Sequence, residues 1–288
     1  MSSSVQSVEA ASPKAGSRSA VFEALANFHR RRWLIRYFLQ RQIARDYQRS
    51  FLGFAWAFLG PLMMVGLLAL VFSEFVGLRF RPVEGDDTLN FGLYLYCGLL
   101  PFLAYSESLS KSVNSIRASS GLIQKVMFPM EFLPFTTAVT SLIDKIFGFV
   151  ALLAMVLLLQ HGLEWTVLLL PIILVPQLLF ILGLSYVMAV LGTFLPDVRE
   201  VMRAVVRATF FLTPIIWPAD RVPQDSALRP LIDYNPLAFL VNAYRDLILF
   251  GETPGLLSTI LFTLFATALF VFGFWLFVRL KSRFVDIL

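Results

Sequence analysis

The feature that most constrains this chain is a junction between a basic segment and a long uncharged one. Arg41, Arg45 and Arg49 recur every four residues, and no charged residue occurs from position 53 to position 73. A helix needs about 20 apolar residues to cross the ~30 Å hydrocarbon core of a bilayer. The junction therefore predicts a charged segment that leads directly into a membrane-spanning helix.

The composition extends this prediction to the whole chain. Of its 288 residues, 58% are hydrophobic and only 15% are charged, whereas soluble domains carry about 25% charged residues. Chains embedded in lipid must satisfy their backbone polar groups internally, which favours helices. We therefore expect an all-α integral membrane protein. Residues 1–20 are rich in Ser and Ala, lack the apolar core of a secretory signal and are predicted to be a disordered tail.

Six apolar segments have the length and composition of membrane spans. They are predicted at residues 53–76, 90–108, 132–159, 165–195, 202–217 and 255–278, the fourth broken by Pro171 and Pro176. With the N-terminus inside, 18 of the 24 Lys and Arg residues fall in cytoplasmic segments and five fall outside. Positive loops remain in the cytoplasm, so the predicted topology is N-in and C-in. The net charge of +5 needs no nucleic-acid partner, because it is divided among short loops.

Two segments outside the spans also have helical patterns. Residues 21–52 form a predicted amphipathic helix at the cytoplasmic interface, with Ile35, Phe38, Leu39 and Ile43 on one side and the arginine row on another. The same charges could instead serve only to anchor the first span. Residues 218–254 form a long outer loop whose apolar part is too short to cross the bilayer. It is expected to be a re-entrant helical hairpin, or else an amphipathic surface helix.

Few residues in the sequence suggest a catalytic, nucleotide-binding or metal site. The chain contains no phosphate loop of the Gly-x-x-x-x-Gly-Lys type and no Gly-x-Ser-x-Gly elbow. His29 and His161 lie far apart in the sequence, which argues against a metal site. Asp144 and Lys145 lie inside the third span, where ionisable residues are functional candidates. Neighbouring residues point about 100° apart on a helix, so these two cannot pair neatly with each other, and a structural role for them is the alternative.

Several short motifs, taken in order, resemble the permease subunit of type 2 ABC exporters that move polysaccharides. The resemblance covers about residue 38 to the end of the chain. Its motifs are residues 49–61 (RSFLGFAWAFLGP), 98–102 (GLLPF), 121–129 (GLIQKVMFP), 194–199 (FLPDVR), 214–215 (PI), 235–237 (NPL) and 244–245 (YR). The family includes O-antigen, capsular polysaccharide and teichoic acid exporters.

The resemblance implies a transport subunit of the bacterial inner membrane rather than an enzyme. Two copies of such a permease pair with two copies of an ATPase subunit, which binds ATP and Mg²⁺, so no cofactor is expected in this chain. Residues 21–52 would act as a gate helix, and periplasmic export proteins would be further partners. Residues 111–130 would form the coupling segment that docks on the ATPase, with Lys111, Arg117, Lys125 and Phe128 as contacts.

The resemblance also implies a pore between two copies, built from spans one, two and five. Sugar rings can stack on aromatic side chains, which would let a polysaccharide slide. The channel candidates are Trp56, Tyr94, Tyr96, Phe102, Tyr105, Phe210, Phe211 and Trp217. Aromatic residues also pack cores and mark membrane interfaces. Tyr94 and Tyr96 are two positions apart, so at most one of them is expected to face the pore.

The lipid-linked end of such a substrate carries phosphate, which arginine binds well. Two arginine rows are candidates for this contact: Arg41, Arg45 and Arg49, and Arg199, Arg203 and Arg207. Anchoring to anionic lipid headgroups would explain the same rows. The alternative functions are export of a small drug or lipid-like substrate, an integral membrane glycan or lipid transferase, and a passive channel.

Overall fold

The structure is a computed structural model. It describes residues 30, 32–47, 59–60, 62–64, 66–67, 70–71, 87–125, 129–159, 162–217, 222–223, 225–226 and 229–287. Throughout these residues the regular elements are helices, and no strand occurs. The all-α prediction is thus confirmed for this part of the chain.

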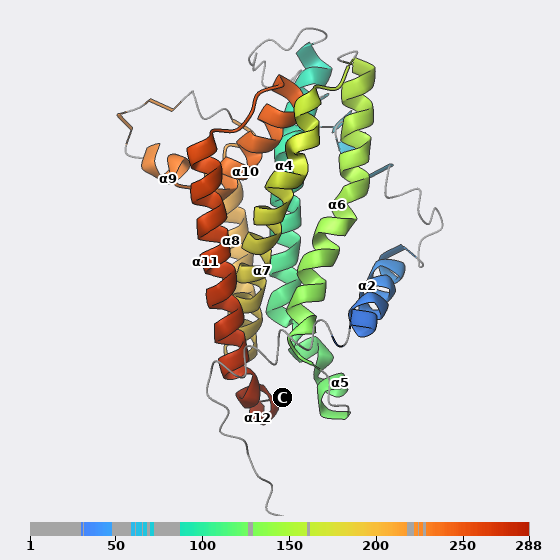
Figure 1. Ribbon diagram of the computed structural model, residues 1–288, viewed down its shortest axis with the longest axis vertical. Coiled ribbons are helices and arrows are strands. Elements are labelled where there is room, and N and C mark those ends of the chain that lie inside the picture. Colours follow the sequence, from blue (N-terminus) through green and yellow to red (C-terminus); the bar gives the residue numbers. More distant parts are fainter. Residues whose placement is uncertain are drawn as a thin grey trace, which may run out of the picture.

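Long helices run side by side along the longest axis of the molecule (Figure 1). They are α4 (Asp87–Ser115), α6 (Phe132–Leu159), α7 (Leu170–Phe194) and α11 (Leu256–Leu280), with α8 (Val198–Leu212) beside α4. Among the described residues, three segments are long and apolar enough to cross a membrane, namely Phe132–Leu159, Trp165–Phe194 and Leu256–Arg283. They coincide with the predicted third, fourth and sixth spans.

The remaining predicted spans are not settled by helix length and composition. Helix α4 includes the second predicted span but continues past charged residues to Ser115. Helix α8 has 15 residues, fewer than the roughly 20 that a crossing needs. Most of the first predicted span, residues 53–76, lies outside the described residues. The six-span topology therefore stays a prediction.

Among the described helices, α7 and α11 form the most extensive pair, and they cross at two glycines. A Cβ atom on Gly183 would lie 2.7 Å from backbone atoms of Leu269 and Phe270, and Gly273 lies against the Gly183 carbonyl. Small residues allow helices in lipid to approach closely and gain dispersion energy. The structure of α7 corrects the prediction that Pro171 and Pro176 break the fourth span, because Pro171 lies in the first turn of α7 and the helix continues through Pro176. Helices in membrane proteins tolerate an internal proline when neighbouring groups satisfy the freed carbonyl.

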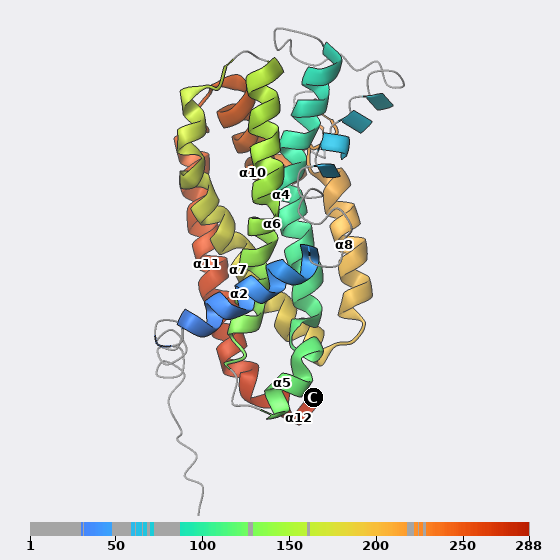
Figure 2. The ribbon, with the colours of Figure 1, turned by 90° about the vertical axis from the view of Figure 1, so that its right-hand side faces the viewer.

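Helix α2 (Arg32–Tyr47) lies obliquely across the outside of the bundle and contacts α6 (Figure 2). Its partly buried positions include Ile35, Phe38 and Leu39, three residues of the predicted apolar side. Trp33 is 68% exposed, so the outward side of α2 carries aromatic as well as basic side chains. Such a mixed surface is typical of helices at a membrane interface.

A short and mostly buried helix lies among the long helices, in the half of the bundle away from α5 (Ser120–Lys125) and α12 (Phe284–Ile287) (Figure 1). This helix, α10 (Pro236–Arg245), follows α9 (Arg229–Asp233) and continues into a π-helical turn, η5 (Asp246–Phe250). Its Asn235 cap accepts a 2.9 Å hydrogen bond from Leu237 N, and Gly251 ends the turn with φ of +66°. Most of α10 is buried, so it is not the surface helix of our alternative prediction. Its depth in a bilayer stays a prediction.

Candidate functional site: two polar clusters in an apolar bundle

The first cluster is centred on Arg245, whose exposed fraction is 2%. Its Nη1 donates a 2.7 Å hydrogen bond to the Pro214 carbonyl, and its Nη2 donates one of the same length to the Ile215 carbonyl. Its Nε donates to the Tyr94 carbonyl at 3.3 Å, and its guanidinium stands 3.6 Å from the centre of the Tyr94 ring. Guanidinium groups combine planar stacking with several directed donors. Arg245 thereby fastens α10 to α4 and to the chain that leaves α8.

Residues near Arg245 leave space for its side chain and join the segments around it. Gly98 on α4 leaves room for it, because a Cβ atom there would lie 2.7 Å from Arg245 Nη2. Asn235 Nδ2 donates to Thr213 Oγ1 at 3.1 Å, which ties the start of α10 to the end of α8. The carbonyl groups beyond a helix C-terminus need hydrogen-bond donors. Here Arg245 donates to two such carbonyls, those of Pro214 and Ile215. Four of the motifs that carry the family resemblance, at positions 98–102, 214–215, 235–237 and 244–245, therefore meet at one place.

Tyr244 extends this cluster, which we call the Arg245 cluster, toward α7. Its hydroxyl donates a 2.7 Å hydrogen bond to Gln177 Oε1, and both residues are buried. A buried tyrosine hydroxyl normally finds such a partner. The adjacent pair Tyr244 and Arg245 thus contacts two helices, α4 and α7, and the segment that follows α8.

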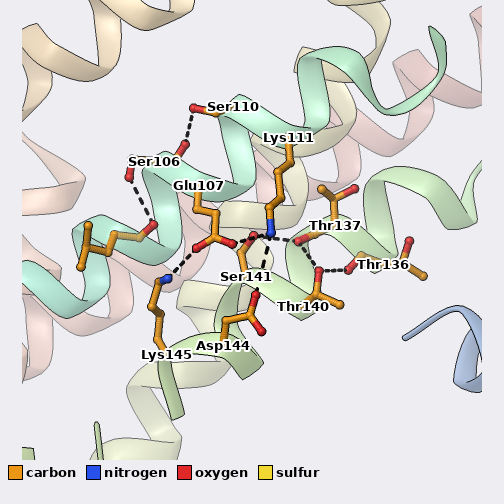
Figure 3. A network of polar contacts seen from close by, with 11 residues as sticks. Ser106, Glu107, Ser110, Lys111, Thr136, Thr137, Thr140, Ser141, Asp144 and Lys145 are labelled. Atoms are coloured by element: carbon orange, nitrogen blue, oxygen red, sulfur yellow. Dashed lines mark hydrogen bonds and ion pairs between the residues drawn. The ribbon is translucent and has the colours of Figure 1, made fainter. Parts of the chain in front are cut away.

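The second cluster joins α4 to α6 through four charged side chains (Figure 3). Glu107 Oε1 lies 2.6 Å from Lys111 Nζ, and Glu107 Oε2 accepts a 2.5 Å bond from Lys145 Nζ. Asp144 Oδ2 is 3.8 Å from Lys111 Nζ. Two acids and two bases balance, and removing one member of such a group leaves another charge without compensation. As the sequence predicted, Asp144 and Lys145 do not pair with each other; both face α4.

Hydroxyl side chains surround this ionic cluster on α6. Thr137 Oγ1 donates to the Leu133 carbonyl at 2.5 Å, Thr140 to Thr136 at 2.8 Å and Ser141 to Thr137 at 2.9 Å. Each hydroxyl is satisfied within its own helix, so the helix buries these groups at little cost. They present a polar α6 surface around the charged residues (Figure 3).

The predicted lipid-phosphate residues lie on different elements. Arg199, Arg203 and Arg207 are exposed on α8, where Arg203 pairs with Glu200. Arg41 is exposed on α2. The Arg45 side chain and all of Arg49 lie outside the described residues.

The predicted channel aromatics separate into core and surface groups. Tyr96, Phe102 and Tyr105 are buried within this single chain, whereas Phe211 on α8 is 67% exposed. Phe210 packs on Phe102 with ring centres 5.3 Å apart. Tyr94 stacks on Arg245, Trp217 Nε1 donates to the Phe211 carbonyl at 3.1 Å, and Trp56 lies outside the described residues.

The predicted coupling residues also have contacts within the chain. Lys111 belongs to the ionic cluster, and Arg117 Nη2 donates a 2.9 Å hydrogen bond to the Thr193 carbonyl at the end of α7. The Lys125 side chain and Phe128 lie outside the described residues. Between Arg117 and Lys125 the chain forms a 3₁₀ turn, η2 (Arg117–Ser119), and then α5.

Sequence reasoning missed three residues that these clusters need: Glu107, Gln177 and Thr213. Glu107 and Gln177 carried a usable signal, because polar and ionisable residues inside apolar spans are costly and usually have partners. Thr213 carried no such signal, since its role depends on Asn235 from another segment.

Comparison with known proteins identifies the family. Residues 34–249 match the ABC-2 type transporter family. The chain belongs to the ABC-2 type transporter family. This range contains both polar clusters, and it confirms the family resemblance seen in the motifs.

Similar proteins of this family carry transport names. One is the "O-antigen export system permease protein RfbA" of Myxococcus xanthus, 28% identical over 72% of this chain and 76% of its own length. A protein of the same name from Klebsiella pneumoniae is 26% identical over 84% of this chain and 90% of its own length. The "Polysialic acid transport protein KpsM" of Escherichia coli is 26% identical over 76% of this chain and 80% of its own length.

Proposed function

We propose that this chain is the membrane-spanning permease subunit of an ATP-driven exporter that moves lipid-linked polysaccharide, an O-antigen or a capsular polysaccharide, across the bacterial inner membrane. The observation that carries the proposal is the similarity to O-antigen export and polysialic acid transport proteins over most of their lengths. The family match spans residues 34–249, so the similarity is not confined to one motif.

Two copies of the chain would enclose the pathway. Helix α8 packs on α4 with one side, while Val201, Val205 and Phe211 are exposed on it. Arg199, Arg203 and Arg207 are exposed on the same helix. An apolar and basic surface of this kind supports a position beside a second copy and a phosphate-bearing lipid.

ATP and Mg²⁺ would bind to a separate ATPase subunit, present in two copies. The proposed docking element is the coupling segment that includes α5. This helix lies at the end of the bundle where the chain also ends (Figure 1), which is the cytoplasmic end in the predicted topology. Helix α2 would lie at the same interface as the gate helix, and periplasmic export proteins would act at the opposite end.

Purification from mild detergent tests the proposal. We expect a phosphate-loop ATPase to copurify with the chain at equal stoichiometry, and a lipid-linked polysaccharide to stimulate ATP hydrolysis by the complex. Stimulation by drug-like amphiphiles, without any response to the glycolipid, would instead favour the small-substrate exporter. A chain that purifies as a stable oligomer and cannot be reconstituted with any ATPase would refute the exporter.

A further inference from the structure

Glu131 is a buried acid at the junction between the proposed coupling segment and α6. It directly follows residues 111–130 and directly precedes α6, and its exposed fraction is 2%. The junction is a hydrogen-bonded turn, in which Phe132 N donates to the Pro129 carbonyl at 3.0 Å. A displacement of the coupling segment would therefore reach Glu131 before any other part of the bundle that follows it in the chain.

Two residues associated with α7 and α11 hold this junction. Tyr186 on α7 donates a 3.0 Å hydrogen bond from its hydroxyl to the Glu131 carbonyl. Lys281 follows α11 in a 3₁₀ turn, η6 (Lys281–Arg283), and its Nζ lies 3.6 Å from Glu131 Oε1. The Tyr186 ring packs edge-on against Phe277 of α11, with ring centres 5.3 Å apart. The backbone and the side chain of Glu131 are thus attached to the same pair of helices.

The turn that carries Lys281 is itself anchored. Phe284, the first residue of α12, has an exposed fraction of 0%. The centre of its ring lies 5.3 Å from that of Phe277 on α11 and 5.7 Å from that of Phe194 at the end of α7. Lys281 therefore lies between α11 and a buried aromatic contact, so its backbone is held against both helices.

The burial of Glu131 explains why a base lies beside it. A buried carboxylate is costly unless an opposite charge compensates it, and Lys281 provides that charge. At 3.6 Å the contact is an ion pair without a hydrogen bond, and Glu131 Oε1 has no hydrogen-bond partner among the described residues. Coulomb attraction falls only as the inverse of distance. The pair would therefore persist through a shift of about 1 Å, which is enough to break a hydrogen bond.

We propose that Glu131 is a positioning residue, which passes movement of the coupling segment to α7 and α11 as well as to α6. The inference rests on the proposed function for the coupling role of residues 111–130, and it adds the route by which their movement reaches the other helices. Helix α6 follows the segment directly in the chain, whereas α7 and α11 are joined to it through Tyr186 and Lys281. Without the ion pair, the segment could move while α11 stayed in place.

Hydrogen exchange of the full-length chain in detergent tests the link without any partner protein. The effect of removing the pair must appear at both of its ends, because coupling is reciprocal. We expect Lys281→Met to speed exchange of the amides of residues 129–136, and Glu131→Gln to speed exchange at residues 277–284, each about three- to tenfold. Arg283→Met is the matched control, because it removes a charge from an exposed position of the same turn.

Two results of this measurement would overturn the proposal. One is exchange that stays as slow in Lys281→Met and Glu131→Gln as in Arg283→Met. The other is a uniform rise over all helices, because that would show a general loss of stability rather than a link between two places. The Lys281 side chain is 31% exposed, so we expect Lys281→Met to fold.

The complex with its ATPase, reconstituted in lipid vesicles, tests the coupling role. The measured quantity is the amount of lipid-linked polysaccharide transported per ATP hydrolysed. We expect Glu131→Gln and Lys281→Met each to lower this ratio about three- to tenfold, while the ATPase still copurifies at equal stoichiometry. The double variant should be no worse than the more severe single one, since both changes remove the same contact. Lys281→Arg retains the charge and should keep the ratio of the unaltered complex.

The outcomes separate this inference from the proposed function. Equal ratios in the variants and the unaltered complex, or additive losses in the double variant, would overturn the inference and leave the exporter in place. An unaltered complex without an ATPase, or without transport, would refute the exporter instead. The exchange measurement needs no partner, so in that case it decides the link by itself.

Discussion

Arg245 shows how much a single side chain can organise in this protein. It is almost fully buried, yet three backbone carbonyls from α4 and from the chain after α8 accept its hydrogen bonds. The nearest of these partners in sequence is 30 positions away, and the farthest is 151 positions away. Charged groups are tolerated in such surroundings only when their donors are satisfied.

Replacing this arginine with lysine tests the geometry rather than the charge. Arg245→Lys keeps the positive charge but loses the planar fork and the stacking on Tyr94. We expect a loss of about 2–3 kcal/mol in the free energy of unfolding, measured by thermal unfolding in detergent. Arg203→Lys is the control, because Arg203 pairs with Glu200 on the exposed side of α8 and such pairs contribute about 0–1 kcal/mol. Equal effects of the two substitutions would contradict the central role of Arg245.

Gly98 provides a second test at the residue scale. A Cβ atom there would lie 2.7 Å from Arg245 Nη2 and 3.0 Å from Val241 Cγ1, so Gly98→Ala should destabilise the fold by about 1–3 kcal/mol. Gly121→Ala on α5 is the matched control, because nothing lies within 4 Å of its added Cβ. It should be neutral or slightly stabilising, since alanine favours helix more than glycine does. Unfolding midpoints in the same detergent compare the two, and a neutral Gly98→Ala would show that Arg245 can move aside.

At the scale of elements, polar contacts determine which helices pair in register. Apolar helix faces can slide past one another in lipid, because lipid tails are as apolar as leucine. The ionic cluster fixes α4 against α6. The 2.8 Å hydrogen bond between Ser108 and Ser185 does the same for α4 and α7.

The ionic cluster predicts a non-additive mutational response. Lys145→Met removes one base and leaves Glu107 with reduced compensation, so the expected cost is about 1–3 kcal/mol. The double variant Glu107→Gln with Lys145→Met should cost less than the sum of its two single substitutions. Thermal unfolding of the unaltered protein, the two single variants and the double variant completes this double-mutant cycle. Additive costs would mean that the two side chains do not interact in the membrane.

At the scale of the whole molecule, the two ends of the bundle differ. One half contains α10, which carries Arg245. The other end bears α5 and α12, and α2 crosses the side of the bundle (Figures 1 and 2). The orientation of these two ends in the membrane, with the basic segments at the cytoplasmic face, stays a prediction.

The arginine rows provide a prediction at this scale. Replacing Arg199, Arg203 and Arg207 together with Gln should lower polysaccharide export without lowering the amount of membrane-inserted dimer, if this row receives the lipid phosphate. The same exchange at Arg41, Arg45 and Arg49 tests the other row. Export is measured as surface polysaccharide, and membrane fractions provide the protein amount. Unchanged export from both variants would rule out the phosphate role and favour headgroup anchoring.

The sequence alone was sufficient for the helical class, for three spans of matching position and for the family. These properties depend on composition, on local periodicity and on motifs that can be read along one stretch of chain. The sequence also marked Asp144 and Lys145 as exceptional, because ionisable residues are rare in apolar spans.

Only the tertiary structure decided which motifs meet. Gly98, Pro214, Asn235 and Arg245 look unrelated in the sequence, and the structure places them in one cluster. The same holds for Gln177 and Tyr244, which lie 67 positions apart in the sequence and are joined by a 2.7 Å hydrogen bond. The physical reason is that hydrogen bonds and close packing act over a few ångströms in space, whatever the separation along the chain, so their partners are fixed only when the helices have packed.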